Sequence, residues 1–330
     1  MINLPASSTV LVTGGTGSLG RALLARLVGT VRELRVLSRD EAKQADLKAQ
    51  YPSVAFMLGD VRDARACAKA VRGVDVVVHA ASLKYVDESE RQPTEYALTN
   101  VVGTINLLHA ALAERTVKAV VGISTDKAAA PINTYGLTKG LLEKLFVEAS
   151  QVPSLALGTE PTRFVVCRYG NVLGSRGSVV LRWAEARRRG ETISVTDPAM
   201  TRFFFTVDDA VDLVGAALGA RSGTIVSKAM PSTTVGALAA AMAQGSLSGI
   251  KVVGRRPGEK EHEDLLTAYE MPRVTRSRED PDVFHYRPLD APRAYYEPPY
   301  TSDAARRLTN RELAELTAPW RCPSASPSSR

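Results

Sequence analysis

The chain has 330 residues, 45% of them hydrophobic and 23% charged, and carries a formal net charge of +7. This balance excludes a disordered chain and is typical of a globular protein. Three scattered cysteines exclude a disulfide framework and a metal cluster, so no metal site is predicted. No apolar run reaches about 18 residues and the N-terminus lacks the features of a signal peptide, so we expect no membrane partner and a cytoplasmic location.

The chain alternates between apolar segments and helical patterns. We predict strands at residues 9–13, 34–37, 54–58, 74–78, 117–123 and 164–168. We predict helices at residues 19–29, 63–72, 94–113, 208–219 and 233–244. Strands that alternate with helices predict an α/β protein with a doubly wound parallel sheet, the Rossmann arrangement, covered by helices on both faces.

The alternating pattern loosens in the second half, where glycine, proline and arginine become frequent. We predict a dinucleotide-binding domain over residues 1–170 that also receives roughly residues 203–222. Residues 171–202 and 223–320 are then expected to form a smaller C-terminal substrate-binding domain. The Ser/Pro-rich residues 321–330 are expected to be a disordered tail.

The positive net charge is compatible with nucleic acid or with small molecules that carry phosphate. The sequence contains no basic block interleaved with aromatic residues. We therefore expect a phosphate-bearing small molecule and no nucleic acid as partner.

A glycine-rich segment follows the first predicted strand and opens the first predicted helix. Its glycines permit a tight turn and a close approach of the backbone to a diphosphate, and the helix N-terminus supplies N–H groups with partial positive charge. This position between strand and helix predicts a dinucleotide site. The residues expected to bind the cofactor here are Gly14, Thr16, Gly17, Ser18, Leu19 and Gly20.

The residues after the second predicted strand distinguish NAD from NADP. An acidic side chain there binds the ribose hydroxyls of NAD, whereas a basic one accepts the 2′-phosphate of NADP. Ser38, Arg39 and Lys43 favour NADP, while Asp40 leaves NAD open. Further residues expected beside the cofactor are Asp60, Val61, Ala80, Ala81 and Lys84. The last of these could equally face the substrate.

The most informative segment follows the strand predicted at 117–123. Tyr135 and Lys139 are four residues apart, so on a helix they share one face. A cationic Lys139 would lower the pKa of Tyr135, and such a phenol can take a proton from a sugar hydroxyl while a nicotinamide takes the hydride. Asp126 and Lys127 add a second acid and a second base, which suggests chemistry beyond a simple alcohol oxidation.

Through the glycine segment and the Tyr135–Lys139 pair, the chain resembles the extended short-chain dehydrogenase/reductases. From about residue 8 to about residue 318 it resembles, more narrowly, the inverting UDP-N-acetylglucosamine 4,6-dehydratases of the pseudaminic acid type. The segments that carry this resemblance are 38–41, 83–86, 124–128, 131–133, 168–178, 200–203 and 256–260.

The resemblance implies a series of proton and hydride transfers on a nucleotide sugar. Tyr135 takes the proton from the hydroxyl on carbon 4, Thr125 orients the substrate, and hydride leaves for the nicotinamide. Lys127, in its neutral form, removes the proton on carbon 5; Lys139 and the oxidised nicotinamide would lower its pKa, while Asp126 opposes them. Asp126 protonates the departing hydroxyl on carbon 6. Hydride returns to carbon 6, which gives a 4-keto-6-deoxy sugar inverted at carbon 5.

The resemblance also implies further binding residues and an assembly into dimers or hexamers. Additional cofactor contacts are implied at Asn100, Tyr135, Lys139, Tyr169 and Asn171. Substrate contacts are implied at Lys84, Thr125, Asn171, Ser178, Val179, Val180, Met200, Arg202, Arg256 and Glu259.

Some positions depart from the family pattern and leave the substrate and the outcome open. Asp87 stands where a proline is usual, Leu98 where a lysine is common, and residues 181–183 replace a proline-containing run. One alternative is a dehydratase of nucleoside antibiotic pathways that releases an exocyclic enol ether. A nucleotide-sugar 4-epimerase is less favoured, because it leaves the second acid–base pair without a task. A redox-sensing module that binds NADP without turnover would not need the tyrosine–lysine pair.

Overall fold

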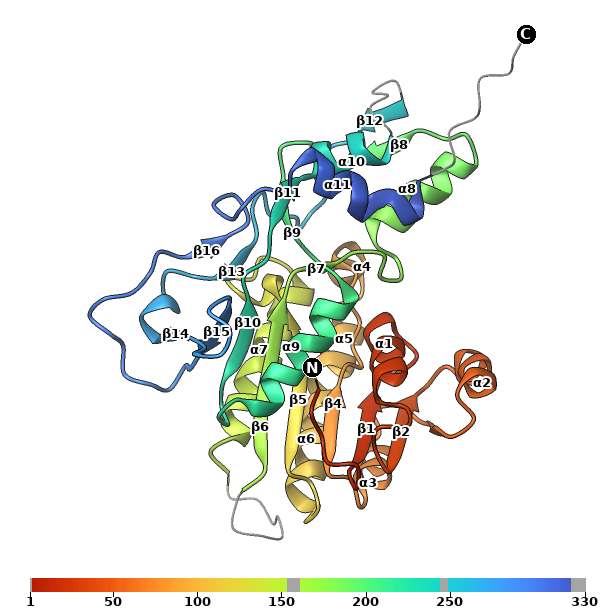
Figure 1. Cartoon of the computed structure of the whole chain (residues 1–330), viewed down its shortest axis with the longest axis vertical. Helices are drawn as coiled ribbons and strands as arrows, with labels where there is room; N and C mark the ends of the chain where they lie inside the picture. The colour runs from red at the N-terminus through yellow and green to blue at the C-terminus, as the bar shows by residue number, and fades with distance from the viewer. Residues whose placement is uncertain (1, 153–160, 244–248, 322–330) are drawn as a thin grey trace.

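The computed structural model describes residues 2–152, 161–243 and 249–321 (Figure 1). Its largest sheet has nine strands, with these bounds: β1 Thr9–Thr13, β2 Glu33–Ser38, β3 Ala55–Leu58, β4 Val76–His79, β5 Ala119–Thr125, β6 Arg163–Tyr169, β10 Ile225–Lys228, β14 Val274–Arg276 and β15 Val283–Tyr286. The spatial order is β14-β15-β10-β6-β5-β4-β1-β2-β3. From β3 to β10 the strands are parallel, and β15 runs antiparallel to β10. The doubly wound parallel sheet predicted from the sequence is confirmed.

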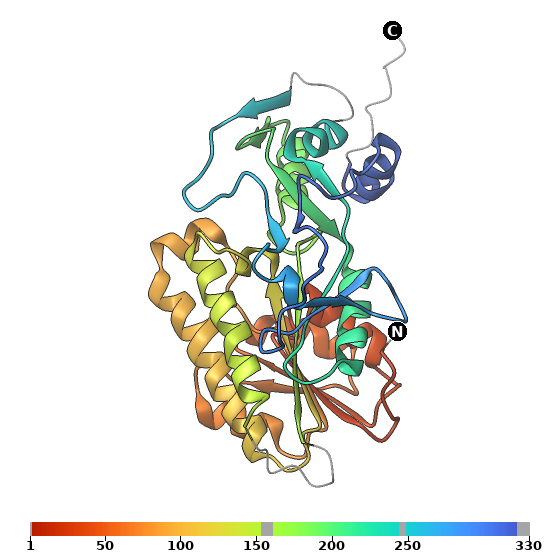
Figure 2. The ribbon, with the colours of Figure 1, turned by 90° about the vertical axis from the view of Figure 1, so that its left-hand side faces the viewer.

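Helices cover both faces of this sheet, which explains why its central strands are continuous apolar runs (Figure 2). One face carries α3 Ala64–Val71, the run α5 Pro93–Tyr96, η1 Ala97–Val102 and α6 Gly103–Ala113, and α7 Thr134–Ala149. The other face carries α1 Ser18–Leu27 and α9 Val207–Gly219. Two further helices, α2 Glu41–Gln50 and α4 Val86–Arg91, lie in connections that follow strands.

The run from Pro93 to Ala113 has the length and mean hydropathy that would let a helix cross a membrane. Leu107, Leu108 and Ala111 are nevertheless buried, and the run packs against α3 and α7. This run is therefore a helix that covers one face of the sheet, and it agrees with the helix predicted at 94–113.

A smaller lobe lies beyond the carboxyl ends of the parallel strands (Figure 1). Its strands are β7 Asn171–Val172, β8 Ile193–Val195, β9 Thr201–Phe205, β11 Ser232–Thr234 and β12 Ile250–Val252. Its helices are α8 Val179–Arg188, α10 Val235–Met242 and α11 Asn310–Thr317. A separate hydrophobic cluster that includes Trp183, Ile193 and Leu238 holds this lobe together. The remaining short elements are β13 Asp264–Leu266, β16 Tyr300–Thr301, η2 Asp126–Ala128, η4 Met271–Arg273 and η5 Ala318–Trp320.

The boundary expected between the two domains differs from the structure. β10, β14 and β15 fall within residues 223–320, which we expected to belong to the smaller domain, yet they extend the main sheet. The reason is that β6 would otherwise be an open edge, and Ile225 and Val226 pair with it directly. The sequence reading also missed α2 and α8. The end of the helix predicted at 233–244 and residues 322–330 of the expected tail lie outside the described residues.

Candidate active site

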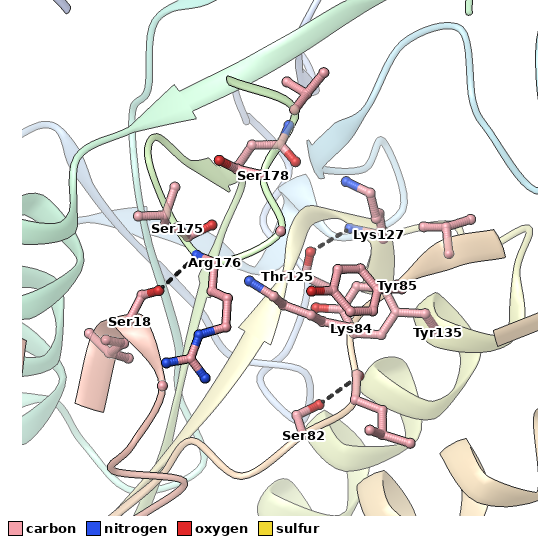
Figure 3. Close-up of a pocket in the computed structure, with 18 of the residues that line it drawn as sticks. Ser18, Ser82, Lys84, Tyr85, Thr125, Lys127, Tyr135, Ser175, Arg176 and Ser178 are labelled. Atoms are coloured by element: carbon pink, nitrogen blue, oxygen red, sulfur yellow. Dashed lines mark hydrogen bonds between the residues drawn. The ribbon is translucent and has the colours of Figure 1, made fainter. Parts of the chain in front are cut away.

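A cavity of about 850 Å³ runs along the carboxyl ends of the parallel strands and into the smaller lobe. Its walls come from the glycine-rich segment, the ends of β4, β5 and β6, helix α7 and helix α8. Figure 3 shows Lys84, Thr125, Lys127 and Tyr135 grouped on one side, with Arg176 extending from the other.

Helix α7 delivers Tyr135 and Lys139 to the cavity. Asn133 caps the helix, because its side chain accepts a hydrogen bond of 2.7 Å from the Gly136 N–H. A Cβ on Gly136 would collide with the carbonyl oxygen of Lys127. Glycine at this position therefore lets the first turn of α7 approach the turn that carries Lys127.

The pKa values of the tyrosine–lysine pair differ from expectation. Burial raises the pKa of Tyr135 to about 12, although the charge of Lys127 and a hydrogen bond with Thr125 oppose this rise. Burial also lowers the pKa of Lys139 to about 7, against the opposing charge of Glu143. The expectation that Lys139 lowers the pKa of Tyr135 is therefore not met: the cation that acts on the phenol is Lys127.

Lys127 lies between two carboxylates. Its Nζ is 3.1 Å from Oδ1 of Asp126 and 3.1 Å from Oε1 of Glu263. Burial alone would lower the pKa of Lys127, but the two carboxylates raise it above its usual value. The expected lowering of the Lys127 pKa by Lys139 is thus corrected, because Asp126 and Glu263 are the dominant neighbours. The two carboxylates therefore favour the ammonium form of Lys127.

Asp126 is buried behind the cavity rather than lining it. Burial raises the pKa of its carboxyl, with Lys127 opposing. The Thr125 hydroxyl, which does line the cavity, donates to Oδ1 of Asp126 at 2.9 Å. The second oxygen, Oδ2, is buried and has no hydrogen-bond partner among the described residues. Asp126 is therefore connected to the cavity through Thr125 and Lys127.

The glycine-rich segment fits a dinucleotide. Gly14 has a φ of +68°, and a Cβ there would lie 2.7 Å from the Ala81 backbone nitrogen. Gly17 is the N-cap of α1 and provides no side-chain cap, so the first N–H groups of this ten-residue helix are open to an anion. All the residues expected at this segment line the cavity, namely Gly14, Thr16, Gly17, Ser18, Leu19 and Gly20.

The end of the cavity near β2 carries both acids and bases. The Asp40 carboxylate caps α2 through the Lys43 N–H at 3.0 Å and also binds the Lys43 ammonium. Asp60 is 3.7 Å from Arg39 and 2.8 Å from Arg62. Both acids are thus already paired with bases. The expected cofactor residues that line this end and its neighbouring wall are Ser38, Arg39, Asp40, Lys43, Asp60, Val61, Ala80, Ala81 and Lys84.

Asn100 is the one expected cofactor residue that does not line the cavity. It is fully buried, accepts from the Leu83 N–H at 2.8 Å and donates to the Thr138 hydroxyl at 3.0 Å. Its place is under the loop that carries Lys84. The expected cofactor contact of Asn100 is therefore corrected. Asn100 instead holds this loop, because the backbone groups of the loop need a buried hydrogen-bond partner.

The expected substrate residues do line the same cavity. They are Lys84, Thr125, Asn171, Ser178, Val179, Val180, Met200, Arg202, Arg256 and Glu259, and Tyr169 joins them from the end of β6. Arg202 donates to the carbonyl oxygens of Thr201 at 2.7 Å and Lys260 at 2.8 Å. Much of its guanidinium therefore holds protein backbone.

Among the charged residues of the cavity wall that were not predicted as site residues, Glu263 and Arg176 make the contacts most relevant to the site. Glu263 follows the 256–260 segment and is almost completely buried. The Arg176 backbone N–H donates to the Ser18 hydroxyl at 2.9 Å, and its guanidinium donates to the Thr16 carbonyl at 3.3 Å. Arg176 lies in the 174–177 loop, where Gly174 and Gly177 both adopt a positive φ. The two glycines were the sequence signal available for a tight loop there.

Several known proteins are similar to this chain over most of its length. The chain matches the family of polysaccharide biosynthesis proteins over residues 10–283. It is 37% identical to the UDP-glucose 4-epimerase of Rickettsia canadensis, over 93% of this chain and 94% of that protein. The X-ray structure of Pen from Bacillus thuringiensis has a TM-score of 0.87 at 32% identity and covers 96% of this chain and 99% of its own. DesIV, a dTDP-glucose 4,6-dehydratase from Streptomyces venezuelae solved with NAD and TYD bound, has a TM-score of 0.66 at 26% identity over 76% of this chain and 86% of that one.

Proposed function

The chain belongs to the polysaccharide biosynthesis protein family, among the nucleotide-sugar-modifying short-chain dehydrogenase/reductases, and we propose that it is a nucleotide-sugar 4,6-dehydratase. One observation carries this proposal: Lys127, held by Asp126 and Glu263, lines the same cavity as Tyr135. Oxidation at carbon 4 needs only the tyrosine, whereas elimination of water needs a second base and a second acid. The substrate we propose is UDP-N-acetylglucosamine, with inversion at carbon 5.

The cofactor we propose is NADP. The glycine-rich segment would hold the diphosphate, and Ser38, Arg39 and Lys43 would face the 2′-phosphate. Asp40 and Asp60 already pair with neighbouring bases, so they are less free to bind the ribose hydroxyls of NAD. This pairing supports NADP for this chain, whereas DesIV was solved with NAD bound. When bound, the nicotinamide ring accepts a hydride from carbon 4 and supplies it again to carbon 6.

In the first step Tyr135 takes the proton from the hydroxyl on carbon 4, which Thr125 orients. With a pKa of about 12, Tyr135 is a poor proton acceptor unless a cation stabilises its phenolate. The ammonium of Lys127 supplies part of that stabilisation. The resting charge of Lys127 thus assists the first step before this residue acts in the second.

In the second step Lys127, as the amine, removes the proton on carbon 5, which the new ketone has made acidic. The carbon–hydrogen electron pair forms the double bond between carbons 5 and 6, and the bond from carbon 6 to oxygen breaks. Asp126 gives the proton that turns the departing hydroxyl into water, through the Thr125 hydroxyl 2.9 Å away. The raised pKa of Asp126 favours the protonated acid that this transfer requires. Lys127 or its partner then reprotonates carbon 5 on the opposite face.

A nucleotide-sugar 4-epimerase is the second candidate. The relative from Rickettsia canadensis carries this activity in its name and aligns over 93% of this chain. An epimerase would use Tyr135 and the cofactor alone, and it would return the hydride to carbon 4. The buried cluster around Lys127 would then be structural.

Incubation with UDP-N-acetylglucosamine in heavy water tests these candidates. The 4,6-dehydratase gives a product lighter by one water, with a carbonyl at carbon 4, a methyl group at carbon 6 and deuterium on carbon 5. An epimerase gives a product of unchanged composition with no deuterium. A product with an exocyclic methylene and no carbonyl would identify the enol-ether dehydratase.

The substrate diphosphate is proposed to lie near Arg256 and Lys84, which line the cavity. Within the described residues Lys84 has no ion-pair partner, and burial together with Arg176 lowers its pKa. A cation at the cavity wall without an ion-pair partner among the described residues favours an anionic ligand.

We also propose that the protein forms a homo-oligomer. Leu137 and Leu141 on α7 and Leu98 and Val102 on η1 are exposed large apolar residues on neighbouring helices. A second copy of the chain would cover this face. Light scattering at several protein concentrations measures the assembly, and a monomer at all of them would exclude it.

A further inference from the structure

We propose that Glu263 is a positioning residue of the acid–base site: it holds Lys127 toward the cavity and accepts the Lys127 proton, so that the amine can act as a base. This inference rests on the proposed dehydration. It deepens that proposal by adding a third member to the group formed by Lys127 and Asp126.

The contacts of Glu263 support the first part. Its Oε1 is 3.1 Å from Lys127 Nζ and 3.6 Å from Arg202 Nε. Glu263 lines the cavity, whereas Asp126 on the other side of Lys127 does not. Of the two carboxylates that hold Lys127, Glu263 is therefore the one on the cavity side.

Several tethers fix the segment that carries Glu263 against the catalytic turn. Asn133 donates to the Gly258 carbonyl at 2.8 Å, and the Lys260 ammonium donates to the Ala129 carbonyl at 2.8 Å. The Glu263 N–H donates to the Ser302 hydroxyl at 2.8 Å. These contacts hold Glu263 beside Lys127, although the two residues are far apart in the chain.

A second anchor lies seven residues further along. Arg168, at the end of β6, binds Glu270 through two hydrogen bonds of 2.8 and 2.9 Å and Glu143 through two of 2.6 and 2.8 Å. This bidentate network is buried. The Glu263 segment is therefore attached to the connection between η2 and α7 at one end and to β6 at the other, and these contacts fix its position relative to Lys127.

The remaining oxygen of Glu263 supports the proton-accepting part. Oε2 is buried and has no hydrogen-bond partner within the described part of the chain, so it retains capacity for a proton. The charged groups that face Glu263 are Lys127, Arg202 and Lys260, with Asp126 as the neighbouring acid. Burial alone would raise the pKa of Glu263, but these cations lower it below its usual value. At rest the proton therefore stays on Lys127, and its transfer to Glu263 is an uphill step that the reaction must drive.

The proton step balances without any other reactant. One N–H bond of the Lys127 ammonium breaks and one O–H bond forms on Glu263, so the net charge of the group is unchanged. The neutral amine can then take the proton from carbon 5. After the elimination, Lys127 or its partner returns a proton to carbon 5 on the other face. The group then recovers its resting state, with the ammonium on Lys127 and the carboxylate on Glu263.

The test uses Glu263→Gln in the full-length protein, with Glu261→Gln as matched control. Glu261 lies two residues away, is exposed and pairs with Arg255. Product formation, reduced cofactor by its absorbance in a single turnover, and deuterium uptake at carbon 5 are measured for each protein. We expect Glu263→Gln to lower product formation about 100-fold, to lose the deuterium uptake and to accumulate reduced cofactor, because oxidation at carbon 4 continues. Glu261→Gln should match the wild type.

The pH profile separates proton transfer from simple packing. In Glu263→Gln the Lys127 proton must leave to solvent, so the rate should rise about tenfold per pH unit in a range where the wild type is flat. Glu263→Asp, which keeps the carboxylate, should restore part of the rate and the flat profile. A Glu263→Gln variant with wild-type rate and profile, or one in which oxidation and elimination fall equally, would overturn the inference. Wild-type protein that releases no water would overturn the proposed function and this inference together.

Discussion

The Nζ of Lys127 lies 3.1 Å from Oδ1 of Asp126, with the lysine side chain 14% exposed and the aspartate side chain fully buried. The two residues are adjacent in the chain and lie in the turn η2, and Gly170 packs against the aspartate. A Cβ on Gly170 would lie 3.1 Å from Asp126 Oδ2 and 2.6 Å from the Phe203 Cβ. The pair is thus enclosed by backbone that leaves no space for a larger residue.

Replacing Lys127 by methionine should destabilise the protein in a pH-dependent way. The variant leaves Asp126 and Glu263 buried without their cation, which we expect to cost about 3–5 kcal/mol at neutral pH. A carboxyl whose folded-state pKa is raised stabilises the fold at low pH and loses that contribution as the pH rises through the raised pKa. The deficit in melting temperature should therefore be larger at pH 8 than at pH 5.

The matched control for this experiment is Lys118→Met. Lys118 also forms an ion pair of 2.8 Å, with Asp75, but its side chain is 71% exposed. Its loss should change the stability by less than about 1 kcal/mol. Equal melting temperatures of Lys127→Met and the wild type at pH 8 would contradict the buried pair.

Lys139→Met should stabilise the protein at neutral pH while it abolishes turnover. The lysine titrates at about 10.4 in the unfolded chain but at about 7 in the folded protein, chiefly because of burial. Between these pH values Lys139 is protonated in the unfolded chain but neutral in the folded protein, which lowers the free energy of unfolding. This loss of stability is complete below pH 7. The gain in melting temperature should be largest near pH 6 and vanish near pH 10.

Lys144→Met, an exposed position on the same helix, is the control and should show no such pH dependence. A constant difference between Lys139→Met and the wild type from pH 6 to pH 10 would mean that Lys139 titrates normally in the folded state.

Tyr135→Phe should remove the first step without affecting cofactor binding. We expect product formation to fall by at least about 100-fold, since the phenol is the only proposed acceptor for the carbon-4 proton. Cofactor affinity, followed by fluorescence titration of NADPH, should stay within a few fold. Tyr269→Phe, at an exposed tyrosine, should retain full activity. Product formation by Tyr135→Phe at the wild-type rate would remove this residue from the mechanism.

The parts of the site that local patterns specify were predictable from the sequence. The glycine-rich segment after β1 and the Tyr135–Lys139 spacing each lie within one turn or one helix, so residue order fixes their geometry. The apolar runs likewise located the parallel strands, because such strands are buried on both faces.

The parts that depend on long-range contacts were not predictable. Glu263 reaches Lys127 from well over a hundred positions away, and no local pattern reports that approach. The same holds for β14 and β15, short strands in a Pro- and Arg-rich region that join the sheet because β10 offers an edge. The pKa directions expected for Lys127 and Tyr135 were wrong for two reasons. Burial raises the pKa of Tyr135, and the carboxylates of Asp126 and the distant Glu263 raise that of Lys127 against the effect of burial.

Arg176→Ser should weaken cofactor binding, since Arg176 joins the loop from the smaller lobe to the glycine-rich segment. Its guanidinium donates to the Thr16 carbonyl, and its charge adds to the effect of burial in lowering the pKa of Lys84 across the cavity. A second cation beside the diphosphate site should be worth about one tenfold step in affinity for NADPH. Titration of NADPH fluorescence measures this, with Arg188→Ser, at an exposed arginine of α8, as the control. Unchanged affinity would mean that Arg176 only fixes the loop. A similar loss of affinity in both variants would mean that the net charge of the protein, and not Arg176 itself, attracts NADPH, an effect that added salt would screen.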